Sequence, residues 1–215
     1  LQDALPSATL QTASRLTHWV CENAKSTRAY LKRIDALYPL ALSLQQQQIT
    51  ELPREVHKKG DHGDKGSAPF DARPLLAAAL NGHDIGLVCE AGMPAVADPG
   101  SSVVRAAHAL GIEVLALPGP VSLLLALAAS GLNGQNFAFV GYLPQDAGQR
   151  SARIKQLEAH ALKGGQTQLL IETPYRNAAM LQALVQTLQP NSRLSISWGL
   201  TLPGSRTRSG TVAQW

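Results

Sequence analysis

The sequence predicts an α/β fold made of two α/β domains. Short apolar runs alternate with helical stretches, and turns that contain Gly and Pro follow several of these runs. In addition, 45% of the 215 residues are hydrophobic and only 16% are charged, which indicates well-filled cores. We expect a domain boundary near Leu117, with an N-terminal α/β domain over residues 1–117 and a C-terminal α/β domain over residues 118–215.

The first half of the N-terminal domain begins with a predicted helix over residues 8–16. An apolar run at residues 18–21 predicts a strand, and a helix over residues 25–34 follows it. Residues 43–66 are polar and rich in Gln, Gly and Lys, so we expect a long loop there. A helix over residues 74–81 then leads into the next strand.

The second half of this domain contains the most informative segment, residues 84–120. Its apolar run at residues 85–89 predicts a strand that is buried on both faces. A helix over residues 102–110 and a second apolar strand over residues 113–117 follow. This order of elements implies parallel strands with right-handed crossovers.

The C-terminal domain repeats the alternation of strands and helices and ends in a hairpin. The helices are predicted over residues 121–130, 149–162 and 177–188, the strands over residues 137–140, 168–172 and 194–198, and the hairpin through residues 206–211.

The turns at residues 90–94 and 118–120 follow predicted strands. Carboxyl ends of strands are where open α/β sheets bind ligands. Gly and Pro there bring backbone groups close to a ligand, so a flat polar heterocycle or a carboxylate is a suitable occupant. Ordinary turns of an α/β sheet explain the same spacing equally well. The chain contains neither GxGxxG nor GxxxxGK[ST], so a dinucleotide site or a P-loop is not supported.

Four motifs together resemble one known family. They are CEAGMPAVADPG at residues 89–100, PGP at residues 118–120 with Ser122 after it, ASGLNGQNFAFVGYLP at residues 129–144 and IETPYRN at residues 171–177. In order and spacing they resemble the tetrapyrrole (corrin/porphyrin) methylase superfamily, and within it the branch of bacterial ribosomal-RNA ribose 2′-O-methyltransferases. The resemblance implies a two-domain enzyme that binds S-adenosylmethionine in a cleft between its domains, needs no metal and forms a homodimer. In the family, a further strand precedes the helix that opens this chain, so we expect an N-terminal piece outside this sequence.

The resemblance also implies the residues that contact the cofactor. They are Glu90, Ala91, Gly92, Met93, Pro94, Val96, Ala97, Ser122, Glu172, Thr173, Pro174, Leu202 and Pro203. Arg176 is expected to guide an anionic substrate, although a salt bridge within its domain explains this residue as well.

Two catalytic residues, Glu22 and Arg28, follow from the same resemblance. They match the place where ribosomal-RNA members carry an acidic and basic EDTR-like cluster, and Asn23 stands here in place of the second acid. A solvated helix start explains them as well, because Glu near a helix N-terminus is favoured by the helix dipole.

The methyl acceptor stays open between RNA ribose and a tetrapyrrole. A precorrin or uroporphyrinogen C-methyltransferase would bind a macrocycle that bears many carboxylates, and the modest number of basic residues in the loops counts against it. A non-catalytic homologue that binds the cofactor is a third alternative. The formal net charge of +4 is compatible with an RNA partner but too small to demonstrate one.

The remaining features indicate a cytoplasmic protein without a membrane partner or a metal. The longest apolar stretch, residues 123–129, is much shorter than the ~20 residues of a membrane span. Cys21 and Cys89 lack CxxC spacing and are interpreted as buried thiols. His and Asp recur at residues 57–65, but the Lys and Gly among them favour a flexible loop or a lid over a metal site.

Overall fold

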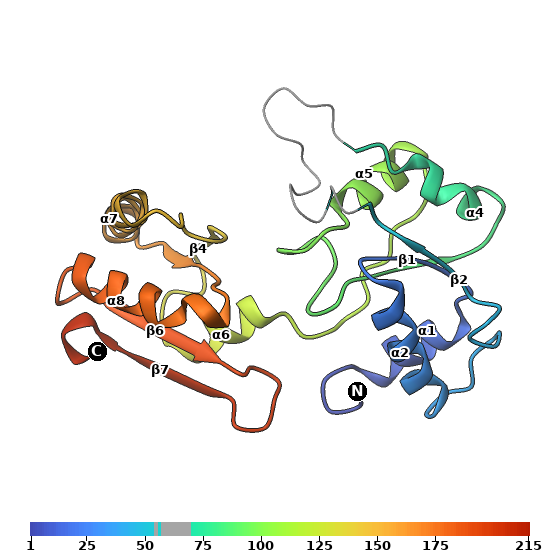
Figure 1. The fold of residues 1–215 in the computed structure, drawn as a ribbon, viewed down its shortest axis with the longest axis horizontal. Coiled ribbons are helices and arrows are strands. Elements are labelled where there is room, and N and C mark those ends of the chain that lie inside the picture. The colour runs from blue at the N-terminus through green and yellow to red at the C-terminus, as the bar shows by residue number, and fades with distance from the viewer. Residues whose placement is uncertain (54–55, 57–69) are drawn as a thin grey trace. The chain divides into compact units, whose positions relative to one another are not determined.

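The computed structural model describes residues 1–53, 56 and 70–215, and it confirms the predicted α/β class. By their internal contacts these residues form two compact units, unit 1 from Leu1 to Pro120 and unit 2 from Val121 to Trp215. Figure 1 shows the helices and strands of both units. The sequence-based boundary near Leu117 stays a prediction.

Unit 1 contains a parallel sheet with the strand order β2-β1-β3. Its elements are α1 (Ser7–Arg15), β1 (His18–Cys21), α2 (Ala24–Asp35), β2 (Gln48–Glu51), η1 (Arg73–Leu76), α4 (Ala77–Leu80), β3 (Ile85–Val88) and α5 (Ser101–Ala109).

Helices cover both faces of this sheet, and two neighbouring residues of β1 show why. Side chains alternate between the faces of a strand, so Trp19 and Val20 point in opposite directions. Trp19 is buried in a cluster with Leu10 of α1 and Leu31 of α2. Val20 is buried in a second cluster, which includes residues of η1 and α5. The layers are therefore α1 and α2, the sheet, and then η1, α4 and α5 (Figure 1).

Trp19 fits into the sheet because its parallel partner on β3 is Gly86. A Cβ atom at Gly86 would lie well under 3.0 Å from the indole ring, which real structures do not show. The indole Nε1 donates to Oε1 of the buried Gln47 at 2.9 Å. The ring is thus fixed on one side by a hydrogen bond and on the other by the backbone of β3.

Three sequence-based predictions in unit 1 were wrong. β2 lies within the predicted loop 43–66, where it pairs with β1 although most of its side chains are exposed. Residues 113–117 form no strand, since they pair with no other described strand, and Leu115 is 74% exposed. β3 is half-buried along most of its length instead of buried on both faces.

Unit 2 contains two small sheets, with β4 and β5 parallel and β6 and β7 antiparallel. Its elements are α6 (Ser122–Ser130), β4 (Phe137–Phe139), α7 (Ala147–Gly164), β5 (Thr167–Leu169), η2 (Pro174–Arg176), α8 (Asn177–Thr187), β6 (Arg193–Trp198), β7 (Arg206–Thr211) and η3 (Val212–Gln214). The core joins α7 to α8 through Ile154, Leu157, Met180 and Leu184.

The longest helix, α7, has clear start and stop signals. The Asp146 side chain accepts a hydrogen bond from the Gln149 amide at 2.8 Å, and Gly165 ends the helix in the left-handed conformation. Within the described part of the chain, every helix is too short or too polar to cross a membrane.

Candidate functional site

Two predicted site residues of unit 1, Glu22 and Glu90, lie at the carboxyl edge of its sheet. Glu22 directly follows β1, and Glu90 comes two residues after β3. The chain places β2 on one side of β1 and β3 on the other, so this edge is a topological switch point. Open α/β sheets bind their ligands at such points.

Glu22 and Glu90 are in direct contact although 68 positions separate them in the sequence. The Glu90 amide donates to Glu22 Oε2 at 3.1 Å, and the Ser26 hydroxyl donates to Glu90 Oε1. The Glu22 amide donates in turn to the Val88 carbonyl at 3.3 Å, which extends the β1–β3 pairing. The structure therefore brings together one predicted catalytic residue and the first residue of the predicted cofactor loop.

The N-terminus of α2 follows Glu22, and Asn23 has a structural role there as the residue that caps this helix. The Asn23 side chain accepts from the Ser26 amide at 3.0 Å, so it caps the helix. The Ala24 amide donates to Glu51 Oε1 at 2.6 Å, which satisfies another of the free amides at the helix start. Arg28 is exposed on α2 and makes no hydrogen bond or ion pair with Glu22 or Glu90.

The loop from Cys89 to Gly100 has an unusual backbone. Ala95 and Ala97 adopt φ angles of 65° and 64°, which cost about 1–3 kcal/mol each for residues with a Cβ atom. Hydrogen bonds from the Ala95 amide to the Pro99 carbonyl and from the Val96 amide to the Met93 carbonyl, both at 3.2 Å, stabilise this conformation. Strain of this kind concentrates at binding sites.

The same loop offers backbone donors to a ligand. The amides of Ala91, Gly92 and Ala97 have no hydrogen-bond acceptor among the described residues, and all three residues are exposed. Gly92 has a φ of 74°, and a Cβ atom there would lie 3.7 Å from Asp98 Oδ2. Because the side chains are small and the amides are free, the loop forms a cradle in which the backbone can donate hydrogen bonds to a polar ligand.

Two groups of this loop, Cys89 and Asp98, have raised pKa values. Burial, and next the nearby Asp98 carboxylate, raise the pKa of the Cys89 thiol to about 12. Burial and the Glu22 carboxylate raise the pKa of Asp98. The Cys89 Sγ donates to the Ala91 carbonyl at 2.9 Å. Cys89 is half-buried rather than buried as predicted.

A groove in unit 2 lies at the carboxyl ends of β4 and β5. Thr173 and Arg176, both predicted from the sequence, line it. The full lining is Tyr142, Leu143, Pro144, Gln145, Arg150, Thr173, Tyr175, Arg176 and Ala179. The sequence analysis missed Tyr142, Arg150 and Tyr175, although two of them stand within the GYLP and PYR motifs that it used.

Arg176 forms a salt bridge within unit 2, the alternative that the sequence left open. Its Nη2 lies 3.1 Å from Glu172 Oε2 and also donates to the Leu143 carbonyl at 3.2 Å. The Glu172 side chain is only 7% exposed, and its Oε1 accepts from the Thr173 amide at 2.8 Å. Glu172 Oε2 forms an ion pair with Arg176, but the geometry of this contact is not that of a hydrogen bond. This pair ties the two loops of the groove together.

The remaining predicted residues of unit 2 lie outside the groove. Ser122 is exposed at the start of α6, and Pro174 is exposed at the start of η2. Leu202 and Pro203 are exposed in the turn between β6 and β7. The possible metal loop at residues 57–65 lies outside the described residues.

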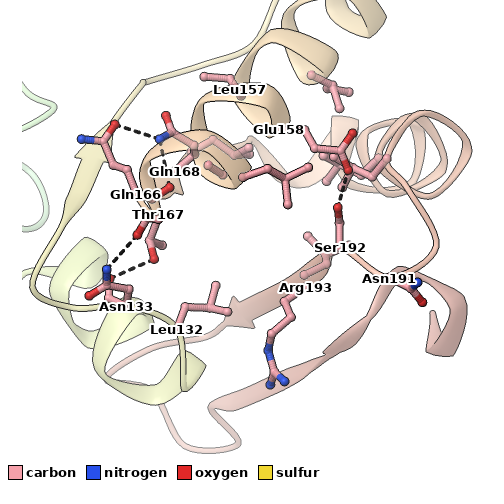
Figure 2. A pocket seen from close by; sticks show the side chains of 18 of the residues that line it. Leu132, Asn133, Leu157, Glu158, Gln166, Thr167, Gln168, Asn191, Ser192 and Arg193 are labelled. Atoms are coloured by element: carbon pink, nitrogen blue, oxygen red, sulfur yellow. Dashed lines mark hydrogen bonds between the residues drawn. The ribbon is translucent and has the colours of Figure 1, made fainter.

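A separate pocket of about 340 Å³ lies in unit 2, and Figure 2 shows it. Leucines of α7 and α8 form much of its wall, and it contains none of the predicted site residues. On its rim the Thr167 hydroxyl donates to the Asn133 carbonyl at 2.9 Å, and the Ser192 hydroxyl donates to Glu158 (Figure 2). Two charged residues, Glu158 and the exposed Arg193, also line this pocket (Figure 2).

The chain is similar to known methyltransferases over most of its length. The profile of the Tetrapyrrole (Corrin/Porphyrin) Methylases matches residues 8–215. Ribosomal RNA small subunit methyltransferase I of Mesorhizobium japonicum is 36% identical over 156 residues, which cover 73% of this chain and 49% of that protein. The protein of the same name from Pseudomonas aeruginosa is 39% identical over 102 residues, 47% of this chain and 35% of that one. The chain thus spans about half the length, or less, of these curated relatives.

Solved structures with the same fold include the methyltransferase CobJ, with a TM-score of 0.59 and 19% identity over 100% of this chain and 83% of that one. A uroporphyrin-III C-methyl transferase from Thermus thermophilus complexed with S-adenyl homocysteine has a TM-score of 0.50 and 16% identity, over 98% of this chain and 78% of that one. At these identities the likeness shows the fold alone.

Proposed function

Because the chain belongs to the tetrapyrrole (corrin/porphyrin) methylase family, we propose that it binds S-adenosylmethionine and transfers a methyl group to ribosomal RNA. The observation that carries this proposal is the contact between Glu22 and Glu90. This contact places Glu22, the proposed proton acceptor, beside the strained loop from Cys89 to Gly100, which has free backbone amides. Both lie at the topological switch point of the parallel sheet.

The residues of the loop fit the cofactor. The free amides of Ala91, Gly92 and Ala97 suit its carboxylate and the polar edge of its heterocycle, and no large side chain of these residues blocks them. When bound, the cofactor supplies a methyl group on a sulfonium, which is already reactive. The chain must then position the acceptor and remove a proton from an attacking hydroxyl.

Glu22 is the proposed proton acceptor. Its Oε2 is held by the Glu90 amide, whereas its Oε1 has no hydrogen-bond partner among the described residues. A carboxylate that is oriented at one oxygen and free at the other can accept the proton of a ribose hydroxyl. Arg28, exposed one turn further along α2, is proposed to hold a phosphate of the acceptor RNA.

In unit 2, Thr173 and Pro174 are proposed to contact the cofactor, with Ser122, Leu202 and Pro203 contributing further contacts. Glu172 and Arg176 hold the loop that carries Thr173. Ribosomal RNA is preferred over a tetrapyrrole as the acceptor because the relatives that are 31–39% identical are named for small-subunit RNA. A cytoplasmic location and a homodimer stay predictions.

Calorimetric titration with S-adenosylhomocysteine tests the cofactor site. Gly92→Leu places a side chain in the proposed cradle, and Gly82→Leu is its matched control. Both glycines have a positive φ in unit 1, 74° and 84°, so both variants bear similar backbone strain. We expect binding to the unchanged chain and to Gly82→Leu, and no binding to Gly92→Leu. Equal binding to both variants would place the cofactor elsewhere, and no binding to the unchanged chain would contradict the proposal.

Methyl transfer to small ribosomal subunits tests the acceptor and the role of Glu22. Glu22→Gln keeps an acceptor for the Glu90 amide but is a far weaker base, so the rate of transfer is expected to fall about 10²- to 10⁴-fold. Glu113→Gln, an exposed acid in the same unit, is expected to have no effect. Transfer to uroporphyrinogen instead of RNA would favour the tetrapyrrole alternative, and binding of S-adenosylhomocysteine without transfer to either acceptor would indicate a non-catalytic homologue.

A further inference from the structure

Two tyrosines in the unit 2 groove are exposed to an unusual degree. Tyr175 is 89% exposed and Tyr142 is 57% exposed. They come from different loops, because Tyr142 follows β4 and Tyr175 follows β5, yet both line the same groove. Tyrosine side chains at such positions bury little surface on folding, so their rings are available to a partner.

Arg150 supplies a cation to the same groove. Its Nη1 donates to the Gln145 carbonyl at 2.9 Å, while its Nε is buried without a hydrogen-bond acceptor among the described residues. It forms no ion pair with any described residue, whereas its neighbour in the groove, Arg176, is neutralised by Glu172. The charge of Arg150 is therefore the one that an anionic partner can use.

The charge of the whole unit favours such a partner. Unit 2 carries eight Lys and Arg against three Asp and Glu, a formal net charge of +5, whereas unit 1 carries eleven against twelve, a net charge of −1. The positive charge of the protein is thus concentrated in the unit that bears the groove. A polyanion is attracted to this unit rather than to the other.

We infer that Tyr142, Tyr175 and Arg150 bind a single-stranded segment of the RNA substrate, with bases stacked on the two rings and a phosphate held by Arg150. Exposed rings next to an unpaired arginine are the combination that binds unpaired nucleotides, because every base has a face that can stack on an aromatic ring. The bases of duplex RNA already stack on one another, so the groove favours single strands. This inference rests on the proposed function and names the contacts that hold its RNA substrate.

Fluorescence anisotropy with a labelled single-stranded RNA 12-mer tests the two rings. Tyr175→Ala is expected to weaken binding about 5- to 150-fold, as the loss of one stacked base does. Tyr175→Phe keeps the ring and should bind nearly as the unchanged chain does. Because the side chain is exposed, both variants should keep the circular dichroism spectrum of the parent. Equal binding by all three proteins, an equal loss in both variants, or equal affinity for duplex RNA would overturn the inference.

The salt dependence of the same titration tests Arg150. Arg150→Gln should weaken binding and reduce the slope of log K against log salt by about 0.7, the value for one lost phosphate contact on a single strand. Arg153→Gln is the matched control, because Arg153 lies on the same helix outside the groove, and its guanidinium donates to Gln156. Equal slopes for the two variants would contradict the role of Arg150.

Two further measurements distinguish RNA binding at the groove from cofactor binding and from self-association. Titration of the unchanged chain with S-adenosylhomocysteine tests cofactor binding independently of RNA binding. Loss of cofactor binding would contradict the proposed function, whereas loss of the RNA contacts would contradict only the present inference. Sedimentation of Tyr175→Ala and the unchanged chain should give the same oligomeric state. If the substitution alters self-association and leaves RNA affinity unchanged, the groove is an interface between copies of the chain, and the inference is wrong.

Discussion

Gly86→Ala should destabilise unit 1 far more than an ordinary substitution of glycine by alanine. The added Cβ would lie well under 3.0 Å from the Trp19 ring and 3.1 Å from Leu16 Cδ1. Carbon atoms in contact normally stand about 3.5–4.0 Å apart, so the ring must move by at least ~0.5 Å. Trp19 is 2% exposed and its indole donates to Gln47, so a movement of the ring disturbs a buried side chain and its hydrogen bond.

The expected loss of unfolding free energy is about 1–5 kcal/mol. Overpacking of a core costs about 1–3 kcal/mol, and loosening a buried hydrogen bond such as that between Trp19 and Gln47 adds about 1–3 kcal/mol. Replacement of a strand glycine by alanine returns about 0.5–1 kcal/mol, because alanine loses less backbone freedom on folding.

Urea unfolding followed by circular dichroism measures this loss. Gly134→Ala is the control, because a Cβ atom there meets nothing within 4 Å, and it should change stability by less than about 1 kcal/mol. In a Trp19→Leu background, which removes the indole, Gly86→Ala should cost less than about 1 kcal/mol. A full loss in that background, or no loss in the parent, would refute the packing argument.

Three further predictions concern helix caps and two ionisable groups of the loop after β3. Asn23→Ala removes the α2 cap, and Asp146→Ala removes the α7 cap. Each should lower the free energy of unfolding by about 1 kcal/mol in a urea titration. No loss in either variant would contradict the capping geometry. The Cys89 thiol, with its pKa near 12, should be alkylated by iodoacetamide at pH 8 about 10²-fold more slowly than a free cysteine, because the smaller thiolate fraction outweighs the higher nucleophilicity of that thiolate; mass spectrometry follows the reaction, and a rate near that of free cysteine would contradict this prediction. The pKa of Asp98 is raised in the folded chain, so its ionisation opposes folding as pH rises through that pKa; Asp98→Asn should therefore stabilise the chain at pH 7 but not at pH 3 in urea titrations, and an equal effect at both pH values would contradict this reasoning.

The sequence predicted well those elements whose residues carry their own signals. The strand at residues 18–21 was predicted with its observed bounds, because its apolar run is buried within the sheet. The α7 helix was predicted over residues 149–162, within two residues of its observed bounds Ala147–Gly164, and Gly165 ends it because glycine tolerates the left-handed conformation. The family resemblance, carried by four motifs, is confirmed by the profile match over residues 8–215.

The errors arose where pairing decides the structure instead of local composition. β2 has a single half-buried apolar residue, Ile49, and becomes a strand only because β1 pairs with it. Residues 113–117 have the composition of a strand, but no described strand lies beside them. Neither fact can be read from either segment alone.

The candidate site was predicted residue by residue, but its contacts were not. The sequence assigned Glu22 and Glu90 to different motifs, and only the parallel pairing of β1 with β3 brings their loops together. Tyr142 and Tyr175 lie within two of the four family motifs but were not among the predicted site residues. Their exposure, which identifies them as a surface for a partner, depends on the folded chain.

The strand β1 contributes to two hydrophobic cores, because its adjacent residues Trp19 and Val20 are buried in different clusters. A slip of β1 by one residue relative to its neighbours would move the indole into the layer of η1 and α5 and the valine into the layer of α1 and α2. If α1 and α2 moved away from the sheet, Trp19 would be exposed. If η1 and α5 moved away, Val20 would be exposed. Unit 1 is therefore expected to unfold as one cooperative unit, with the amides of β1 among the last to exchange with solvent.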